Sequence, residues 1–277
     1  MQNPIIILGA PRSGTTILGE ILSAHPDLHY LVEPNPLWRR YVRSRCDYFN
    51  LEQEWDAVEP TKGLFESEMR KSLKMRLLEK TPQNCLRVPF VDAVFPDAKF
   101  VHILRDGVES SLSIARYWQK HTHGFRGVRL RQRLREASLQ QLPRYGIQAF
   151  KRLLPAGTKP RVFWGPVLPG MGQMVDCMSI TEVAAMQWRM CVEQATFHGR
   201  KLPPNQYLEL RIEEFNKEKL KQVIEFVGLS SESSVFEAAE ERFIRDQTAH
   251  RIAEADEKEV ELVKRWVLPT MKWLGQL

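Results

Sequence analysis

The chain has 277 residues, of which 43% are hydrophobic and 27% are charged, and this balance predicts a globular protein with an apolar core. Its 40 Lys and Arg against 34 Asp and Glu give a net charge of +6, which favours anionic small ligands but carries no signature of nucleic-acid binding. No apolar run reaches the ~18 residues of a membrane-spanning helix, and the four cysteines are too scattered for a metal site or a disulfide framework, so we expect a cytoplasmic protein with free thiols.

The predicted elements alternate between strands and helices along the chain. A buried apolar strand, 4–8, is followed by a Gly-bounded loop and a helix, 15–24, which is the usual opening of a phosphate-binding α/β domain. The later predicted strands are 29–32, 100–104 and 207–210, and the later predicted helices are 64–78, 86–95, 106–120 and 181–199. This alternation predicts a single three-layer α/β domain over 1–277, with a central, mainly parallel sheet and a helical and loop insertion over 120–180.

The loop after the first predicted strand has the spacing of a Walker A phosphate loop with one substitution. Residues 9–16 read Gly-Ala-Pro-Arg-Ser-Gly-Thr-Thr, and Thr15 stands where Walker A has its lysine. Backbone N–H groups at a helix N-terminus still bind an anion, and Arg12 offers a guanidinium from within the loop. An ordinary strand-to-helix turn is the alternative. We therefore predict a P-loop-NTPase-like fold whose loop binds a tetrahedral oxyanion through Arg12, Ser13, Gly14, Thr15 and Thr16.

The segment Pro-Arg-Ser-Gly-Thr-Thr resembles the 5′-phosphosulfate loop of the sulfotransferase family, whose sulfuryl donor is 3′-phosphoadenosine-5′-phosphosulfate (PAPS). The second signature of that family is an Arg at a strand end with a Ser eight positions later, and Arg105 and Ser113 have this spacing. The resemblance implies that the pair binds the 3′-phosphate of the donor. Ser110 and Ser111 lie in the same predicted helix, so the sequence leaves open which serine has this role, and we select Ser113.

Two residues are candidates for the chemistry of transfer. Lys80, in Glu-Lys-Thr-Pro, resembles the family's lysine that contacts the oxygen between sulfur and phosphorus. The His that is the base of cytosolic members is replaced by Pro82, whereas Glu33, seven residues after the proline of a His-Pro-Asp segment, resembles the base of the tyrosylprotein sulfotransferases. The resemblance thus implies that Glu33, Lys80 and Arg12 are catalytic, and the apolar residues 30–32 predict partial burial of Glu33. A surface lysine near a turn and a helix N-terminal carboxylate are the structural alternatives.

Three other features are less decisive. His102 alternates within a predicted buried strand, as core histidines do, and His29 is a weaker base candidate than Glu33. Residues 207–215 resemble a late strand of the family, with Ile212 in place of its usual tyrosine. No G-x-x-G-x-x-K segment is present near the C-terminus, so the contacts of the adenine are not assigned.

The predicted insertion is basic. Spacing puts three arginines, at 126, 129 and 133, on one helix face, and five lie within 126–135. A solvated basic face is the favoured interpretation, and attraction of an anionic acceptor such as an acidic saccharide is the alternative. The segment 164–170 either lines an acceptor pocket with its tryptophan or plugs the core.

We therefore predict an enzyme, a PAPS-dependent sulfotransferase that acts without a metal on a hydroxyl or amine of a small-molecule or saccharide acceptor. A nucleotide kinase or other NTPase is the first alternative, and Thr15 and the lack of a clear Walker B aspartate argue against it. A non-catalytic module that binds adenosine 3′,5′-bisphosphate is the second, and it would not need Lys80 and Glu33.

Overall fold

A computed structural model describes residues 3–122, 163–230, 232–245 and 255–276. The chain divides into two compact units, Met1–Ala115 with Gly165–Leu277 and Arg116–Trp164. The larger unit holds the sheet and every candidate site residue. The single domain over 1–277 stays a prediction, and most of the expected insertion, with its arginines at 126–135, lies outside the described residues.

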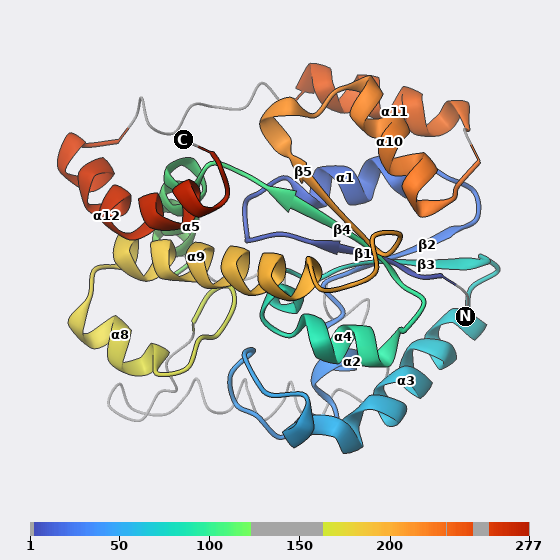
Figure 1. Cartoon of the computed structure of the whole chain (residues 1–277), viewed down its shortest axis with the longest axis horizontal. Helices are drawn as coiled ribbons and strands as arrows, with labels where there is room; N and C mark the ends of the chain where they lie inside the picture. The colour runs from blue at the N-terminus through green and yellow to red at the C-terminus, as the bar shows by residue number, and fades with distance from the viewer. Residues whose placement is uncertain (1–2, 123–162, 231, 246–254, 277) are drawn as a thin grey trace. The chain divides into compact units, whose positions relative to one another are not determined.

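In the described part of the chain, five strands form one sheet in the order β2-β3-β1-β4-β5 (Figure 1). Their bounds are Ile5–Leu8 for β1, Leu28–Val32 for β2, Arg76–Lys80 for β3, Lys99–Leu104 for β4 and Tyr207–Arg211 for β5. All pairings between these described strands are parallel, which confirms the predicted sheet. Because parallel strands end at one common edge, the segments that follow β1, β2, β3 and β4 lie along the same edge of the sheet.

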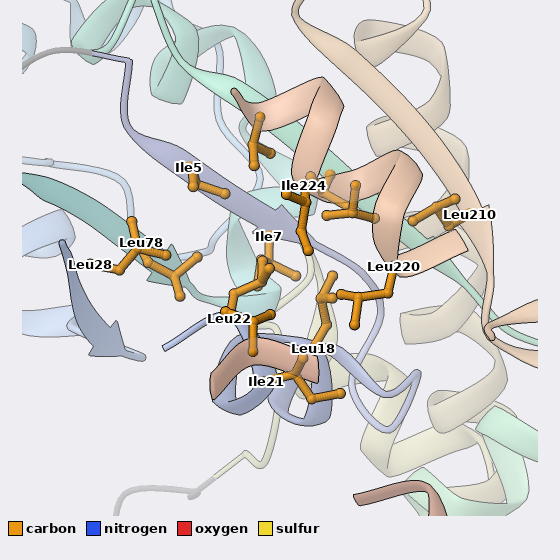
Figure 2. Close-up of a cluster of buried hydrophobic side chains, with 14 of the residues drawn as sticks. Ile5, Ile7, Leu18, Ile21, Leu22, Leu28, Leu78, Leu210, Leu220 and Ile224 are labelled. Carbon is orange, nitrogen blue, oxygen red and sulfur yellow. The ribbon is translucent and has the colours of Figure 1, made fainter. Parts of the chain in front are cut away.

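One face of the sheet is covered by three helices, α1 (Thr15–Leu22), α10 (Lys217–Val227) and α11 (Ser233–Arg245). The apolar residues of α1 recur at a spacing of three and four, which places them on one side of the helix. Figure 2 shows the resulting core between the sheet and these helices, with Ile5, Ile7, Leu78, Leu18, Leu22, Leu220 and Ile224 all buried. This layer holds the helix that begins at the phosphate loop.

The opposite face is covered by α2 (Asn35–Arg39), α3 (Val58–Arg70), α4 (Val88–Val94) and α9 (Ile180–Gly199), with 3-10 turns η1 (Glu52–Ala57) and η2 (Pro82–Leu86). Aromatic side chains pack together in the core on this face. The ring centroid of Trp38 lies 4.6 Å from that of Phe65 and 5.8 Å from that of Phe95. The helices α8 (Met171–Cys177) and α12 (Glu257–Trp273) pack on α9. Helices on both faces of a parallel sheet give the predicted three-layer fold.

One predicted helix is wrong at its end. Residues 64–78 were predicted to be helix-prone, with Lys80 at the end of a strand, whereas α3 ends at Arg70 and β3 spans Arg76–Lys80. Leu77 and Leu78 are fully buried between two neighbouring strands. Pairing on both sides therefore outweighs the local helical preference of the segment, because strand formation depends on its tertiary partners. The helix over 181–199 is observed as α9, and strand 29–32 as β2, each within one residue of prediction.

Candidate active site

The loop between β1 and α1 is folded back by its own hydrogen bonds. The backbone N–H and the hydroxyl of Ser13 both donate to the carbonyl of Ala10, over 3.2 and 2.7 Å. Arg12 and Gly14 take left-handed backbone conformations, with φ of 69° and 92°. At Gly14 a side chain would also collide with Ile212, whose Cδ1 lies 2.8 Å from where a Cβ would stand. The first N–H groups of α1, which have no partner within a helix, then follow directly and provide donors for an anion.

The side chains of the loop divide into outward and inward groups. Arg12 and Thr16 are exposed, whereas Ser13 and Thr15 are 1% and 4% exposed. The methyl group of Thr15 lies against Gly9, at 2.5 Å from where a Cβ on that glycine would stand. The position of the Walker lysine is therefore occupied by an inward-packed threonine, and Arg12 is the cation that the loop presents.

The second predicted binding segment joins β4 to α5 (Gly107–Thr122). Asp106 caps the helix, since its Oδ1 accepts a hydrogen bond from the N–H of Glu109 over 2.8 Å. The N–H of Asp106 in turn donates to Oε1 of Glu213 over 2.8 Å. Glu213 was not identified from the sequence, and it anchors the junction that carries Arg105. The guanidinium of Arg105 lies 3.8 Å from the carboxylate of Glu109.

Hydrogen bonds join the two segments. Arg12 Nε donates to Ser113 Oγ over 3.2 Å, and Arg105 Nη1 donates to the carbonyl of Arg12 over 3.0 Å. Of the three serines considered, Ser111 donates to a carbonyl of its own helix and Ser110 is fully buried. Ser113 is the serine that faces the phosphate loop, as selected from the sequence.

Glu33 and Lys80 meet at the ends of neighbouring strands. Lys80 Nζ donates to Glu33 Oε1 over 2.8 Å, and the N–H of Glu33 donates to the carbonyl of Lys80 over 2.8 Å. The pair lies beside the phosphate loop, because Lys80 is also in register with Ile7 of β1. The lysine side chain is 2% exposed and the Glu33 side chain 45%. The carboxylate is thus less buried than expected, since β2 is an edge strand of the described sheet and Val32 beside it is 53% exposed.

Three features occur together here and resemble those of one family. The loop 9–16 presents Arg12 in place of a Walker lysine, the pair Arg105 and Ser113 faces this loop, and the pair Glu33 and Lys80 lies beside it. The sequence profile described as the Sulfotransferase family matches residues 4–163, more than half of the chain. The chain belongs to the sulfotransferase family.

Curated relatives match over a shorter stretch. Protein-tyrosine sulfotransferase A of Caenorhabditis elegans is 27% identical over 117 residues, which is 37% of this chain and 30% of that protein. Human protein-tyrosine sulfotransferase 1 is 32% identical over 117 residues, 37% of this chain and 31% of that protein. The match spans about a third of the length of these relatives.

Solved sulfotransferase structures share the fold of nearly the whole chain. A sulfotransferase of Mycobacterium avium superposes with a TM-score of 0.55 at 12% identity, covering 98% of this chain and 76% of that one. The sulfotransferase domain of the curacin biosynthetic pathway gives 0.52 at 14% identity, with coverages of 86% and 78%. A mouse sulfotransferase complexed with PAP gives 0.50 at 12% identity, with coverages of 98% and 84%.

The two histidines of the predicted strands lie within β4 and β2. His102 is fully buried, and burial lowers its pKa to about 4. Its Nδ1 lies 2.7 Å from the hydroxyl of Tyr207, so it is the core histidine that the alternation predicted. His29 lies within β2, in register with Leu77, whereas Glu33 lies beyond the end of that strand.

A buried carboxylate that was not identified from the sequence lies next to Lys80. Glu79 is 0% exposed and accepts hydrogen bonds from Trp38 Nε1 and Asn84 Nδ2, each over 2.9 Å, and from Thr81 Oγ1. Burial raises its pKa to about 7. The available signal was a charged residue inside an otherwise apolar strand, since buried carboxylates are rare unless they are hydrogen-bonded.

The segment 164–170 is held to the larger unit from residue 165 onward. The N–H of Val167 donates to Asp47 Oδ2 and its carbonyl accepts from the N–H of Asp47, each over 2.8 Å. Gln187 Nε2 donates to the carbonyl of Pro166 over 2.8 Å. These bonds hold the backbone of Pro166 and Val167 within the larger unit, and both interpretations of the segment stay predictions.

Among the residues that the structure describes, no three His, Cys, Asp or Glu side chains come together as a metal site would require. No described helix has both the length and the apolar character needed to cross a membrane.

Proposed function

We propose that this sulfotransferase transfers the sulfuryl group of PAPS to a hydroxyl or amine of an acceptor. The observation that carries the proposal is the convergence of four charged groups, Glu33, Lys80, Arg12 and Arg105, at one edge of one sheet. The sequence positions of these groups are those of the two nucleotide signatures and the two catalytic residues of the family.

The residues present fit a nucleotide that carries anions at both ends. The N-terminus of α1 and Arg12 suit the 5′-phosphosulfate, while Arg105 and Ser113 suit the 3′-phosphate. A triphosphate fits less well, because the inward-packed Thr15 supplies no cation for its terminal phosphates. The mouse sulfotransferase complexed with PAP, which has the same fold, supports this choice of nucleotide.

The geometry of the pair also supports a direct in-line transfer. PAPS supplies the sulfuryl group on a leaving phosphate that is already a stable anion. Glu33 is placed to take the proton of the acceptor, and its partly exposed carboxylate leaves room for the acceptor to approach. An ammonium has three N–H groups, so Lys80 can hold Glu33 and also donate to the leaving phosphate, together with Arg12.

The acceptor class is part of the proposal. A saccharide or small molecule remains the expectation from the sequence, and the names of the curated relatives add the phenolic hydroxyl of a protein tyrosine. Glu33, whose position resembles the base of those relatives, serves any of these acceptors. The four free cysteines are consistent with a reaction in the cytoplasm.

Thermal unfolding with adenosine 3′,5′-bisphosphate, compared with ATP and Mg²⁺, tests the donor class first. At a ligand concentration near 100 times Kd, binding adds about 2.7 kcal/mol to the free energy of unfolding. In a protein of this size that raises Tm by roughly 2–4 °C. Stabilisation by ATP and Mg²⁺ alone would overturn the proposal. Transfer of label from PAPS to a tyrosine peptide, an acidic oligosaccharide and a simple phenol then identifies the acceptor.

A further inference from the structure

A buried carboxylate lies directly beside the candidate catalytic pair. Glu79 precedes Lys80 on β3, and its three hydrogen-bond donors come from two parts of the chain, the segment directly after β3 and the distant helix α2. Trp38 belongs to α2, Asn84 to η2, and Thr81 follows Lys80 in the chain. The carboxylate therefore ties α2 to the end of the strand that carries Lys80.

Core packing alone does not call for a charge at this position. Taking a carboxylate out of water is unfavourable by several kcal/mol, and well-packed apolar residues often replace buried charges at no loss of stability. Leu77 and Leu78, the neighbours of Glu79 on β3, are apolar and fully buried. What the carboxylate adds is a set of directional hydrogen bonds, which specify how the segments around it are aligned.

The alignment matters because Glu33 lies between β2 and α2. On one side, the N–H of Glu33 is bonded to the carbonyl of Lys80; on the other, Trp38 is bonded to Glu79. Glu33 has a left-handed backbone with φ of 50°, which is unfavourable for a residue with a side chain and persists when the surroundings hold it. The helix α2 has five residues and little stability of its own, so its position depends on its anchors.

We propose that Glu79 is a positioning residue, which acts through Trp38 and α2 to hold the carboxylate of Glu33 against Lys80. The chemical consequence rests on the proposed function, because a displaced Glu33 would no longer meet the acceptor proton. The geometric consequence, a bond between Lys80 and Glu33 that is held in place, does not depend on the proposed function, because this bond can be observed without turnover.

The kinetic test compares Trp38→Phe and Glu79→Leu with a matched control. Tyr207→Phe also removes a hydrogen bond to a carboxylate, that of Glu209, together with the hydroxyl's contact to Nδ1 of His102, while keeping an aromatic ring. We expect kcat to fall by about 10- to 100-fold in the two test variants, since small displacements of reacting groups have effects of this size. Kd for the bisphosphate should not change in them. Tyr207→Phe should retain both constants.

The spectroscopic test follows the ammonium of Lys80 by ¹⁵N NMR of the lysine side chains. Lys80 is 2% exposed and bonded to Glu33, so its ammonium protons should exchange slowly enough to be observed, and Lys80→Met assigns the signal. The signal should disappear in Trp38→Phe and persist in Tyr207→Phe. Where Glu79→Leu fails to fold, Glu79→Gln replaces it. The glutamine side chain has one N–H₂ group in place of a carboxylate oxygen, and this group cannot accept the hydrogen bond that Asn84 Nδ2 donates to Glu79.

The two tests separate this inference from the proposed function. A wild-type protein without sulfotransferase activity would overturn the proposed function, while loss of the Lys80 signal in Trp38→Phe would still establish the positioning. Folded variants that keep both the Lys80 signal and the wild-type kcat would overturn the role of Glu79 and leave the proposed function standing.

Discussion

The carboxylate of Glu33 is the single group whose replacement should separate chemistry from binding. Glu33→Gln keeps the size of the side chain and removes its ability to accept a proton. We expect kcat to fall by on the order of 10²–10⁴, the usual contribution of a general base. The bisphosphate should bind with unchanged Kd, because Arg12, Arg105 and Ser113 are untouched. Steady-state kinetics and calorimetry measure the two constants, and full activity in this variant would falsify the assignment of the base.

Replacement of Arg105 should weaken binding of the bisphosphate, which replacement of Glu33 should leave unchanged. Its guanidinium is 17% exposed, and Nη1 also donates to the carbonyl of Arg12. Arg105→Ala removes charge-assisted hydrogen bonds worth about 1.5–3 kcal/mol, so Kd for the bisphosphate should rise roughly 10- to 150-fold. Arg105→Lys keeps the charge but not the planar fork, and should recover part of the affinity. An unchanged Kd in Arg105→Ala would remove this residue from the nucleotide site.

At the scale of elements, α9 offers a test of stability apart from function. Ser179 caps this helix, since its Oγ accepts from the N–H of Glu182 over 3.2 Å, and Glu182 Oε2 accepts from the N–H of Ser179 over 3.0 Å. The N–H and the hydroxyl of Ser179 both donate to the carboxylate of Glu182, which lowers its pKa. Ser179→Ala should lower the free energy of unfolding by about 1 kcal/mol, with kcat and Kd unchanged. A change in kcat would show that α9 is coupled to the site.

At the scale of the whole molecule, Glu79 makes stability depend on pH. Burial raises its pKa from the ordinary 4.5 to about 7, against the opposing effects of Thr81, Trp38, Arg87 and Lys80. The folded state therefore binds the proton more tightly than the unfolded state, and the stability from protonation is full below 4.5 and is lost as pH rises to about 7. The loss is on the order of 3 kcal/mol.

Glu79→Gln does not titrate, and it isolates this effect from those of other groups. Denaturant unfolding of both proteins between pH 5 and 8 should show the wild type losing stability relative to the variant as pH rises, and the difference should level off above pH 7. The charged and titratable groups around Glu79, which are Arg87, Lys80 and Tyr30, are the same in both proteins. Parallel curves would show that Glu79 keeps one protonation state over this range.

Local sequence patterns were enough to predict the phosphate loop and the sheet that carries it. The phosphate loop and the parallel sheet each follow from contiguous residues, because a loop that binds phosphate and a buried strand need particular residue types at fixed spacings. The selection of Arg105 with Ser113 rested on the resemblance to the sulfotransferase family. The separate positions of Glu33 and Lys80 were also identified, since each lies in a short motif. Their direct bond was not, because it joins residues 47 positions apart.

The tertiary structure alone decided what surrounds these residues. Trp38 meets Glu79 across 41 positions of the chain, so no local pattern indicates that the two share a hydrogen-bond network with Asn84. The boundary between α3 and β3 likewise depended on the neighbouring strands. The sequence by itself determined the family, the sheet and the identity of the charged groups, because these are encoded locally. Their alignment and burial arose from contacts between distant segments, since hydrogen bonding and desolvation depend on what folding brings together.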